Sequence, residues 1–400
     1  MASSTTETPE IAPAGPEAAA RVRALLPSLA AGELDRERTG TPPYDEVKAI
    51  AAAGFGLLRL PAALGGPDLT ITELIGLVVD LGAADPSVAH LWRNHFLFTE
   101  LLRTAPDVYA RWLPDLRAGA LFGLGFGEAA MPRAGTSDFD TRLVRDGAEW
   151  VLTGVKHYST GNLYARHIVV HASLPDARLA QAVVPRDRAG VEVRDDWDGF
   201  GQRFTGSGTT VFAGVRLTEA EVVLPEVLQA RLPERSSPFA QVWLTAVLAG
   251  ICARASATAV EVVRGRQRNY FHGLAEEPRH DPLLQSEVGR LSAGAFAARA
   301  VVLEAARSLD AALAAGTETA LEAASLDAAR AKVVVDDLAT TTTAGLLDTG
   351  GASAVRRGVA LDRHWRNART LIAHNPASYK RRVLGDHLLN GTPPPRGSFF

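Results

Sequence analysis

Apolar residues recur at the spacing of helices over the first part of the chain, from about residue 16 to 120. The clearest run follows the three- and four-residue spacing of one helix face at Leu74, Ile75, Val78, Val79 and Leu81. A second run over residues 88–102 follows Asp85-Pro86, and a proline in the first turn is typical of a helix start. The pattern predicts an N-terminal helical domain.

The period changes between residues 121 and 232. Short segments rich in Val, Thr, Trp and Phe alternate there with turn residues, at 143–144, 150–155, 168–171, 181–184 and 209–215. Asp146-Gly147 separates the first two segments and predicts a β-hairpin. We therefore expect a central, mainly antiparallel β domain.

Long stretches rich in Ala and Leu return after residue 233 and predict extended helices over residues 295–313 and 321–347. Helix breakers bound these stretches at Pro282, Gly316 and Gly350-Gly351. No fixed-period repeat interrupts them.

The order of these patterns predicts an α+β fold with domains at residues 16–120, 121–232 and 233–392. Residues 1–15 are rich in Ser, Thr, Pro and Ala and predict a disordered tail, and residues 393–400 form a second tail that begins with three prolines.

Composition narrows the class of protein. With 46% apolar and 22% charged residues in 400, the chain has the balance of a soluble globular protein. Lys and Arg number 42 against 45 Asp and Glu, so no global positive field is expected to hold nucleic acid. The lone Cys252 fits a reducing cytoplasm, and the start of the chain lacks a signal peptide. The longest mainly apolar run, residues 244–253, is too short for a bilayer, so no membrane association is expected.

A glycine-rich run at residues 122–128 has Gly123, Gly125 and Gly127 in strict alternation. It fits a dinucleotide loop poorly, because no crossover helix follows. Alternating glycines mark one face of a strand that something approaches closely. A flat cofactor ring and a tightly packed helix both remain possible partners for this face.

Two polar segments are candidates for ligand contact. The turn over residues 156–162 carries Ser159 and Thr160, whose hydroxyls could bond a ligand or only the loop itself. His95 lies among apolar neighbours in the helical region, where it is either a satisfied core histidine or a site residue. His90, five positions earlier, does not share its helix face well.

The C-terminal segment 361–376 is richer in chemistry. Arg363, Arg366 and Arg369 share one helix face, and Asn375-Pro376 should end that helix. His374 would then lie at the negative end of the helix dipole, which favours its protonated form, unless it is a structural cap.

Arg268 belongs to a basic cluster, with Arg264 and Arg266, that fits either a phosphate or a solvated face. No His, Cys or carboxylate spacing predicts a metal site.

The architecture, together with Phe55-Gly56-Leu57-Leu58-Arg59-Leu60-Pro61 and Leu64-Gly65-Gly66-Pro67, resembles the acyl-CoA dehydrogenase superfamily over residues 45–392. The resemblance implies an N-terminal helical domain, a central β-barrel-like domain and a C-terminal four-helix bundle, with a flavin at their junction and usually a homotetramer. The dehydrogenases carry a catalytic glutamate where this chain has Asn375. An amide cannot abstract a substrate proton, which disfavours acyl-CoA dehydrogenation.

Residues 361–376, Asp281-Pro282 and the ending at residues 385–391 resemble instead the flavin-dependent monooxygenases of this fold. That branch includes dibenzothiophene and sulfone monooxygenases and amine or amino-sugar N-hydroxylases. The resemblance implies that a separate NAD(P)H-dependent reductase supplies reduced FMN or FAD. The reduced flavin would react with O₂ to give a C4a-(hydro)peroxide that oxygenates a small substrate. Sulfur is the first expectation and N-hydroxylation the second; a flavin dehydrogenase and a flavin-free binding protein are the other classes.

The resemblance also assigns residues. It implies catalytic roles for His95 at the reactive face of the flavin, Ser159 near N5 and His374. It implies further cofactor contacts from the chain at Gly127, Thr136, Ser159, Thr160, Arg268, Gln285, Gly350 and Gly351. Arg268, from a neighbouring subunit as in the dehydrogenases, would pair with the flavin phosphate. Gln285, Gly350 and Gly351 would meet the far end of the cofactor, and with FMN they would lack an adenylate partner.

Overall fold

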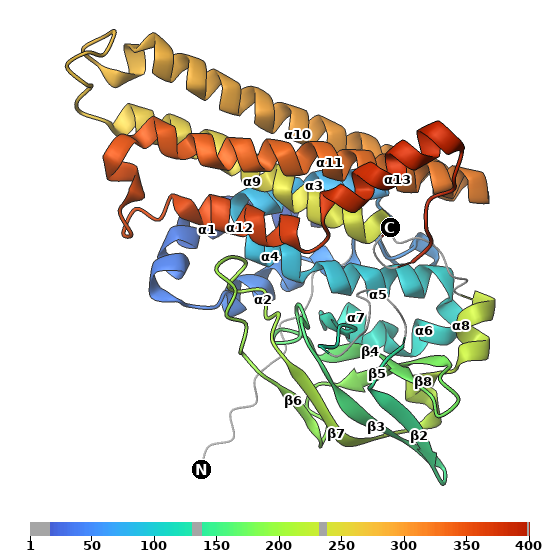
Figure 1. The fold of residues 1–400 in the computed structure, drawn as a ribbon. Helices are drawn as coiled ribbons and strands as arrows, with labels where there is room; N and C mark the ends of the chain where they lie inside the picture. Colours follow the sequence, from blue (N-terminus) through green and yellow to red (C-terminus); the bar gives the residue numbers. More distant parts are fainter. Residues whose placement is uncertain (1–16, 130–137, 232–237, 398–399) are drawn as a thin grey trace, which may run out of the picture.

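The computed structural model describes residues 17–129, 138–231, 238–397 and 400. Long helices form a layer above a curled sheet, and shorter helices join the two (Figure 1). This arrangement confirms the predicted α+β architecture. The tail at residues 1–15 lies outside the described residues.

The N-terminal part is helical, as the apolar spacing predicts. Its helices are α1 (Ala18–Thr39), α2 (Tyr44–Ala52), α3 (Ile71–Ala84), α4 (Pro86–Leu91), α5 (Arg93–Thr104), α6 (Pro106–Tyr109) and α7 (Leu113–Arg117). The expected single helix over residues 88–102 is two helices, because the chain turns at Trp92 between α4 and α5.

Among the described residues, the central part is a curled sheet of eight strands. They are β1 (Phe122–Gly125), β2 (Arg142–Asp146), β3 (Glu149–Lys156), β4 (His167–Ser173), β5 (Leu179–Pro185), β6 (Val191–Val193), β7 (Thr210–Leu217) and β8 (Val222–Val223). The order is β6-β7-β3-β2-β4-β5-β8, with β1 parallel to β4. The hairpin at Asp146-Gly147 is confirmed, since Asp146 pairs with Glu149.

The C-terminal part contains α8 (Pro225–Arg231), α9 (Pro238–Gly265), α10 (Pro282–Ala315), α11 (Glu318–Gly350), α12 (Asp362–Ala373) and α13 (Ala377–Asn390). The three long helices α9, α10 and α11 pack on one another, and α12 and α13 pack on α11. The expected breaks are confirmed, because α10 begins at Pro282, Gly316 caps its end in a left-handed conformation, and α11 ends at Gly350.

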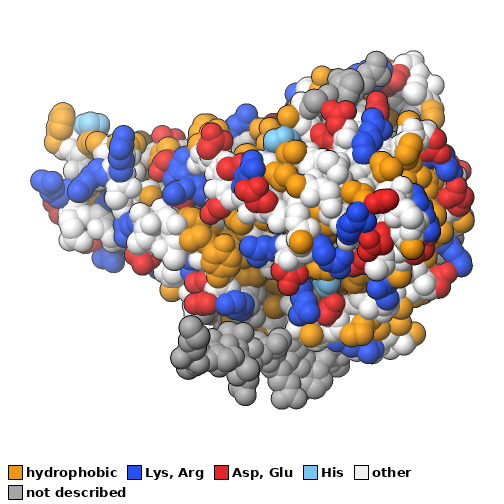
Figure 2. Space-filling view, turned by 90° about the horizontal axis from the view of Figure 1, so that it is seen from below, with side chains coloured by type: hydrophobic (Ala, Val, Ile, Leu, Met, Phe, Trp, Pro, Cys, Tyr) orange, Lys and Arg blue, Asp and Glu red, His pale blue; other side chains and the backbone are white. Residues whose placement is uncertain are grey.

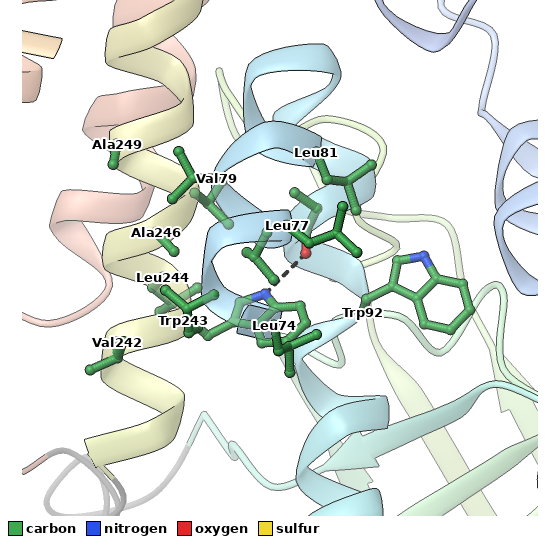
Figure 3. Close-up of a cluster of buried hydrophobic side chains, with 14 of the residues drawn as sticks. Leu74, Leu77, Val79, Leu81, Trp92, Val242, Trp243, Leu244, Ala246 and Ala249 are labelled. Atoms are coloured by element: carbon green, nitrogen blue, oxygen red, sulfur yellow. Dashed lines mark hydrogen bonds between the residues drawn. The ribbon is translucent and has the colours of Figure 1, made fainter. Parts of the chain in front are cut away.

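Helix α9 is the centre of the helical layer. By length and composition alone this helix could cross a membrane. The sequence had predicted a shorter apolar run, over residues 244–253. In the structure, most of the apolar stretch of α9 is buried, and the helix packs against α3, α10 and α11. Figure 3 shows this packing, with Leu74 and Leu77 of α3 facing Trp243 and Ala246 of α9. One continuous core therefore joins the N-terminal and C-terminal helices.

The surface carries both signs of charge. On the face shown in Figure 2, seen from the side of the sheet, basic and acidic side chains are interspersed, and one end of the molecule projects as an arm. Figure 1 places the α9–α10 connection at that projecting end. At the other end of the bundle, Phe400 packs on Ala329 and Val383, so the last residue of the predicted tail contacts the bundle.

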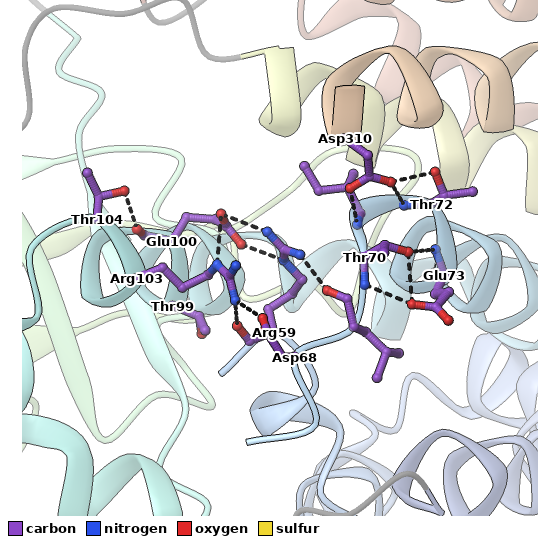
Figure 4. A network of polar contacts seen from close by, with 12 residues as sticks. Arg59, Asp68, Thr70, Thr72, Glu73, Thr99, Glu100, Arg103, Thr104 and Asp310 are labelled. Atoms are coloured by element: carbon purple, nitrogen blue, oxygen red, sulfur yellow. Dashed lines mark hydrogen bonds and ion pairs between the residues drawn. The ribbon is translucent and has the colours of Figure 1, made fainter. Parts of the chain in front are cut away.

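A polar network fastens α3 to the bundle (Figure 4). Asp310 of α10 accepts hydrogen bonds from the Ile71 N–H at 2.7 Å, the Thr72 N–H at 2.9 Å and the Thr72 hydroxyl at 2.6 Å. The carboxylate satisfies free N–H groups and offsets the positive end of the α3 dipole.

We expect Asp310→Asn to lower the free energy of unfolding by about 1–3 kcal/mol, because the amide keeps the shape but loses the charge and one acceptor. Urea denaturation followed by circular dichroism measures this. Asp348→Asn, at an exposed position of α11, is the matched control. Equal stability of the two variants would contradict the bridging role.

Candidate active site

Helix α4 is held in place at its N-terminus by a buried ion pair. Asp85 accepts the N–H groups of Ser87 at 2.9 Å and Val88 at 3.0 Å, and Arg36 donates to its other oxygen at 2.9 Å. Burial raises the pKa of Asp85, and Arg36 and the two N–H groups oppose that change. This is the helix start that Asp85-Pro86 predicts.

A second contact holds the next turn of α4. The indole Nε1 of Trp243 on α9 donates to the Ala89 carbonyl at 3.0 Å, drawn as the dashed line in Figure 3. The backbone beside His90 is therefore fastened to the central helix of the bundle.

His90 is buried and has one free ring nitrogen. Its Nδ1–H donates to Oε1 of Gln202 at 3.1 Å, which leaves Nε2 unprotonated and without a partner among the described residues. Burial and the nearby Arg93 guanidinium lower the pKa of His90 to about 3. The imidazole is therefore neutral near pH 7 and presents a lone pair.

Gln202 joins three parts of the chain at one point. It lies in the β6–β7 connection, bonds His90 of α4, and donates its backbone N–H to Oδ1 of Asn367 on α12 at 2.6 Å. Its φ of 54° is left-handed, which costs a non-glycine residue about 1–3 kcal/mol and persists only where contacts hold it. The amide Nε2 is buried without a partner in the described structure.

The turn after β3 brings Ser159 to the same junction. Ser159 donates its N–H to the Gly208 carbonyl at 3.0 Å, and its neighbour Tyr158 has a left-handed φ of 56°. The Ser159 hydroxyl is buried and has no partner among the described residues. It is free to bond a ligand.

The Thr160 hydroxyl belongs to a chain of hydrogen-bonded hydroxyl groups. Its Oγ1 lies 2.7 Å from the Ser207 hydroxyl, which lies 2.7 Å from Thr205, and Thr205 donates to the Gln202 carbonyl at 2.9 Å. Because Thr205 donates to Gln202, the protons of Thr160 and Ser207 point along the same chain. This chain of hydroxyl groups therefore links the turn to Gln202.

The alternating glycines have a local cause. A Cβ at Gly123 would lie 2.0 Å from Oδ1 of Asn162, and one at Gly125 would lie 3.1 Å from the Lys156 side chain. Side chains of β3 and the following turn, and not a helix, therefore occupy the face of these two residues. Gly127 lies beside the turn, because its carbonyl accepts the His157 N–H at 2.8 Å.

His95 has no free nitrogen. Its Nε2 bonds the Gly56 carbonyl at 2.9 Å, and its Nδ1 accepts the Phe122 N–H at 3.3 Å. Burial lowers its pKa to about 4. The ring would have to give up a backbone bond to contact a ligand, so these contacts do not support the predicted catalytic role.

His374 caps α12, as expected from Asn375-Pro376. Its pKa shifts in the direction opposite to the prediction: burial, with Arg93 and His90 nearby, lowers it well below the usual value and outweighs the helix dipole. The residue nevertheless keeps accessible surface, and so does Arg93, whose pKa burial lowers to about 10. Arg93 lowers the pKa of both His90 and His374, so these three side chains lie near one another.

Asn375 follows His374 and is buried. Its Nδ2 donates to Oε1 of Gln241 on α9 at 3.0 Å. The position at which the dehydrogenases carry a base is thus occupied by an amide bonded to another amide.

The other predicted cofactor residues lie elsewhere. Arg268 is exposed in the α9–α10 connection, Gln285 donates to the Arg279 carbonyl at 3.0 Å, and Gly350 and Gly351 end α11 at the same projecting end of the bundle (Figure 1). Within one chain the structure does not bring them to the Ser159 turn. Thr136 lies outside the described residues.

Two further features delimit the site. A surface cleft of about 350 Å³ lies on the outer side of Leu163 and Tyr164, with Trp197, Arg203 and Phe204 in its wall, and it includes none of His90, Arg93 and His374. Within the described part of the chain, no group of three or more His, Cys, Asp or Glu residues could hold a metal ion.

Comparison with known proteins identifies the family. The acyl-CoA dehydrogenase middle-domain model matches residues 132–215, and the C-terminal-domain model matches residues 242–379. The chain belongs to the acyl-CoA dehydrogenase superfamily. This confirms the resemblance found in the sequence.

Three relatives within the superfamily match nearly the whole chain. The probable FMNH₂-dependent monooxygenase SfnC of Pseudomonas putida is 28% identical over 389 residues, 94% of this chain and 96% of SfnC. FMN-bound TdsC from Paenibacillus sp. A11-2 is 27% identical, with a TM-score of 0.86 over 96% of this chain and 99% of TdsC. The methanesulfinate monooxygenase MsuC from Pseudomonas fluorescens is 26% identical, with a TM-score of 0.83 over 94% of this chain and 98% of MsuC.

Sequence reasoning missed His90, Gln202 and Arg93. One signal for His90 was present, because Asp85-Pro86 marks the start of a helix that reaches it within two turns. Nothing in the local sequence marks Gln202, whose role depends on contacts with α4 and α12.

Proposed function

We propose that this protein is a two-component monooxygenase that uses reduced FMN and O₂ to oxygenate a small organosulfur substrate. The observation that carries the proposal is the set of buried, unpartnered polar atoms at the junction of the three parts: His90 Nε2, Ser159 Oγ and Gln202 Nε2. Buried polar atoms without partners are rare in proteins, and a ligand, an ion or a water commonly satisfies them; three of them meet at one junction here. A solved relative of the same fold, TdsC, binds FMN.

The residues present fit a flavin ring. Ser159 offers a free hydroxyl on a turn that Gly127 and Gly208 hold rigidly through the backbone. Thr160 offers oxygen lone pairs, because its proton bonds within the hydroxyl chain. Bound reduced FMN would supply the electrons that activate O₂, a reaction that no amino-acid side chain here can perform.

The protein's own part is to control protons and water. The neutral His90 can accept a hydrogen bond at Nε2, because Gln202 accepts the proton of the opposite nitrogen. His374, also neutral, lies near His90 and can accept a hydrogen bond from the substrate. The shared core of α3, α4 and α9 shields this side of the site from water.

Assembly would complete the cofactor site. Arg268 and Gly350-Gly351 lie at a projecting end of the bundle, far from the Ser159 turn of the same chain, and we propose that they meet the flavin phosphate of another copy in a homotetramer. Exposed Phe271, in the α9–α10 connection, and exposed Phe296, on α10, are apolar surface for such a contact. A separate cytoplasmic flavin reductase would supply the reduced FMN.

The experiment is turnover with FMN reduced by a generic flavin reductase under ¹⁸O₂. We expect one ¹⁸O atom in the product from a sulfide or a sulfinate, with FMN supporting faster turnover than FAD. An amine substrate tests N-hydroxylation, and an acyl-CoA with a dye tests dehydrogenation, which Asn375 opposes. Oxygen consumption that no substrate couples to product would refute the proposal.

A further inference from the structure

Helix α12 holds the β6–β7 connection, residues 194–209, at two neighbouring positions. Arg366 Nη1 donates to the Phe200 carbonyl at 2.8 Å, and Asn367 Oδ1 accepts the Gln202 N–H at 2.6 Å. Gly201 lies between these two contacts, and a Cβ there would lie 2.3 Å from the Arg366 carbonyl oxygen. The backbone of the connection therefore lies directly on α12.

Helix α12 is itself held against α1 by charged side chains. Arg366 Nη2 donates to Glu37 of α1 at 2.7 Å. One turn earlier on α12, the buried Arg363 pairs with Glu33 of α1 at 2.8 Å. Charged hydrogen bonds of this kind are strong and directional. Asn367 is therefore presented from a helix whose position is fixed.

Gln202 depends on this support, because its backbone is strained. Its φ of 54° lies in the left-handed region, which a non-glycine residue keeps only where contacts hold it. Asn367 accepts the hydrogen bond of its N–H, and Thr205 donates to its carbonyl at 2.9 Å. Gln202 and Asn367 are both buried, so bulk water does not replace a lost acceptor.

Gln202 in turn orients His90. Its Oε1 accepts the His90 Nδ1–H at 3.1 Å, and within the described part of the chain this is the one hydrogen bond of the imidazole ring. A shift of Gln202 would release the ring and move the free Nε2 lone pair. Two hydrogen bonds in series thus connect Asn367, which is 165 positions from Gln202 in the sequence, to His90.

We propose that Asn367 is a positioning residue of the candidate active site. Its side chain fixes the backbone of Gln202, and Gln202 fixes the orientation and the tautomer of His90. The inference rests on the proposed function, in which His90 Nε2 accepts a hydrogen bond from the bound ligand. It adds to that function a residue that acts through Gln202.

Turnover of two Asn367 variants gives the first test. Asn367→Leu keeps the size of the side chain and removes the acceptor, so with reduced FMN and methanesulfinate we expect kcat to fall about tenfold. Asn367→Asp keeps an acceptor oxygen and should remain within a few-fold of the wild type. Asn390→Leu, the same change at the exposed end of α13, is the matched control and should turn over as the wild type does.

A double variant separates positioning from a general loss of stability. Because Asn367 acts through His90, adding Asn367→Leu to His90→Ala should lower the turnover of folded protein no further than His90→Ala alone. Losses that multiply in the double variant would mean that Asn367 acts by another route, and the inference would be wrong. Should Asn367→Leu not fold, Asn367→Ala, which leaves room for a water, takes its place in both tests.

The tautomer of His90 is a readout that needs no turnover. In solid-state ¹⁵N spectra of protein labelled at histidine, the His90 signals are those that His90→Gln lacks. We expect the wild type and Asn367→Asp to show one neutral tautomer with the proton on Nδ1, and Asn367→Leu to show a mixture of both tautomers. An unchanged tautomer in Asn367→Leu would overturn the inference and leave the proposed oxygenation standing. The expected spectra without ¹⁸O in any product would do the reverse.

Discussion

Alanine at position 90 should lower turnover by about tenfold to a hundredfold, because it removes a buried hydrogen-bond acceptor for the bound ligand, worth about 1–3 kcal/mol. The reason is geometric: His90 Nε2 is a buried lone pair without a partner in the described structure, fastened by Gln202, Trp243 and Asp85. Initial rates with reduced FMN and methanesulfinate measure the effect. His90→Gln, which keeps an acceptor oxygen on the side chain, should lower turnover less than His90→Ala does.

His95→Gln is the matched comparison. It removes a buried histidine five residues away whose nitrogens both bond the backbone. It should lower stability and leave the turnover of the folded fraction within a few-fold of the wild type. If His95→Gln abolishes turnover of folded protein and His90→Ala does not, the site has been assigned to the wrong histidine.

Acid should unfold the protein steeply just below pH 6.5. Burial lowers the pKa of His90 and His171 to about 3 and of His95 to about 4, against 6.5 for an exposed histidine. As pH falls, the unfolded chain takes up these protons and the folded chain does not, so stability present above pH 6.5 is lost. Each group costs about 1.4 kcal/mol per pH unit, so the three together cost about 6 kcal/mol by pH 5.

Urea denaturation at a series of pH values from 7.5 to 5 measures this slope. His171→Phe is the variant to compare, because His171 lies in a ring cluster with Phe126 and Phe139 and a phenyl ring has a similar shape. The variant should show a smaller slope than the wild type, because one of the buried histidines that resist protonation is gone. An unchanged slope in His171→Phe, or a flat profile in the wild type, would contradict the prediction.

The local pattern of the sequence predicted most of the elements. The breakers Pro282, Gly316 and Gly350 bound long helices where expected, and Asp146-Gly147 turns a hairpin. These features depend on backbone conformation and on neighbours a few residues away, which the sequence states directly. The resemblance to the superfamily likewise came from short local motifs, such as those at residues 55–61 and 361–376.

The candidate site was only partly predictable, since its properties come from packing. The sequence put forward His374 and the Ser159 turn as candidates, but the predicted direction of the His374 pKa was wrong, because desolvation depends on surrounding atoms that no local pattern contains. His95 and His90 look alike in the sequence, and only the folded chain shows that one bonds the backbone on both sides and the other keeps a free nitrogen.

The sequence by itself therefore determined the order of the elements, the α+β architecture and the superfamily. Tertiary structure alone decided which polar atoms lose their partners when α4, the β6–β7 connection and α12 meet. The physical reason is the range of the interactions. Helix and turn propensities act over a few residues. Burial and hydrogen-bond satisfaction at the site depend on residues more than a hundred positions apart.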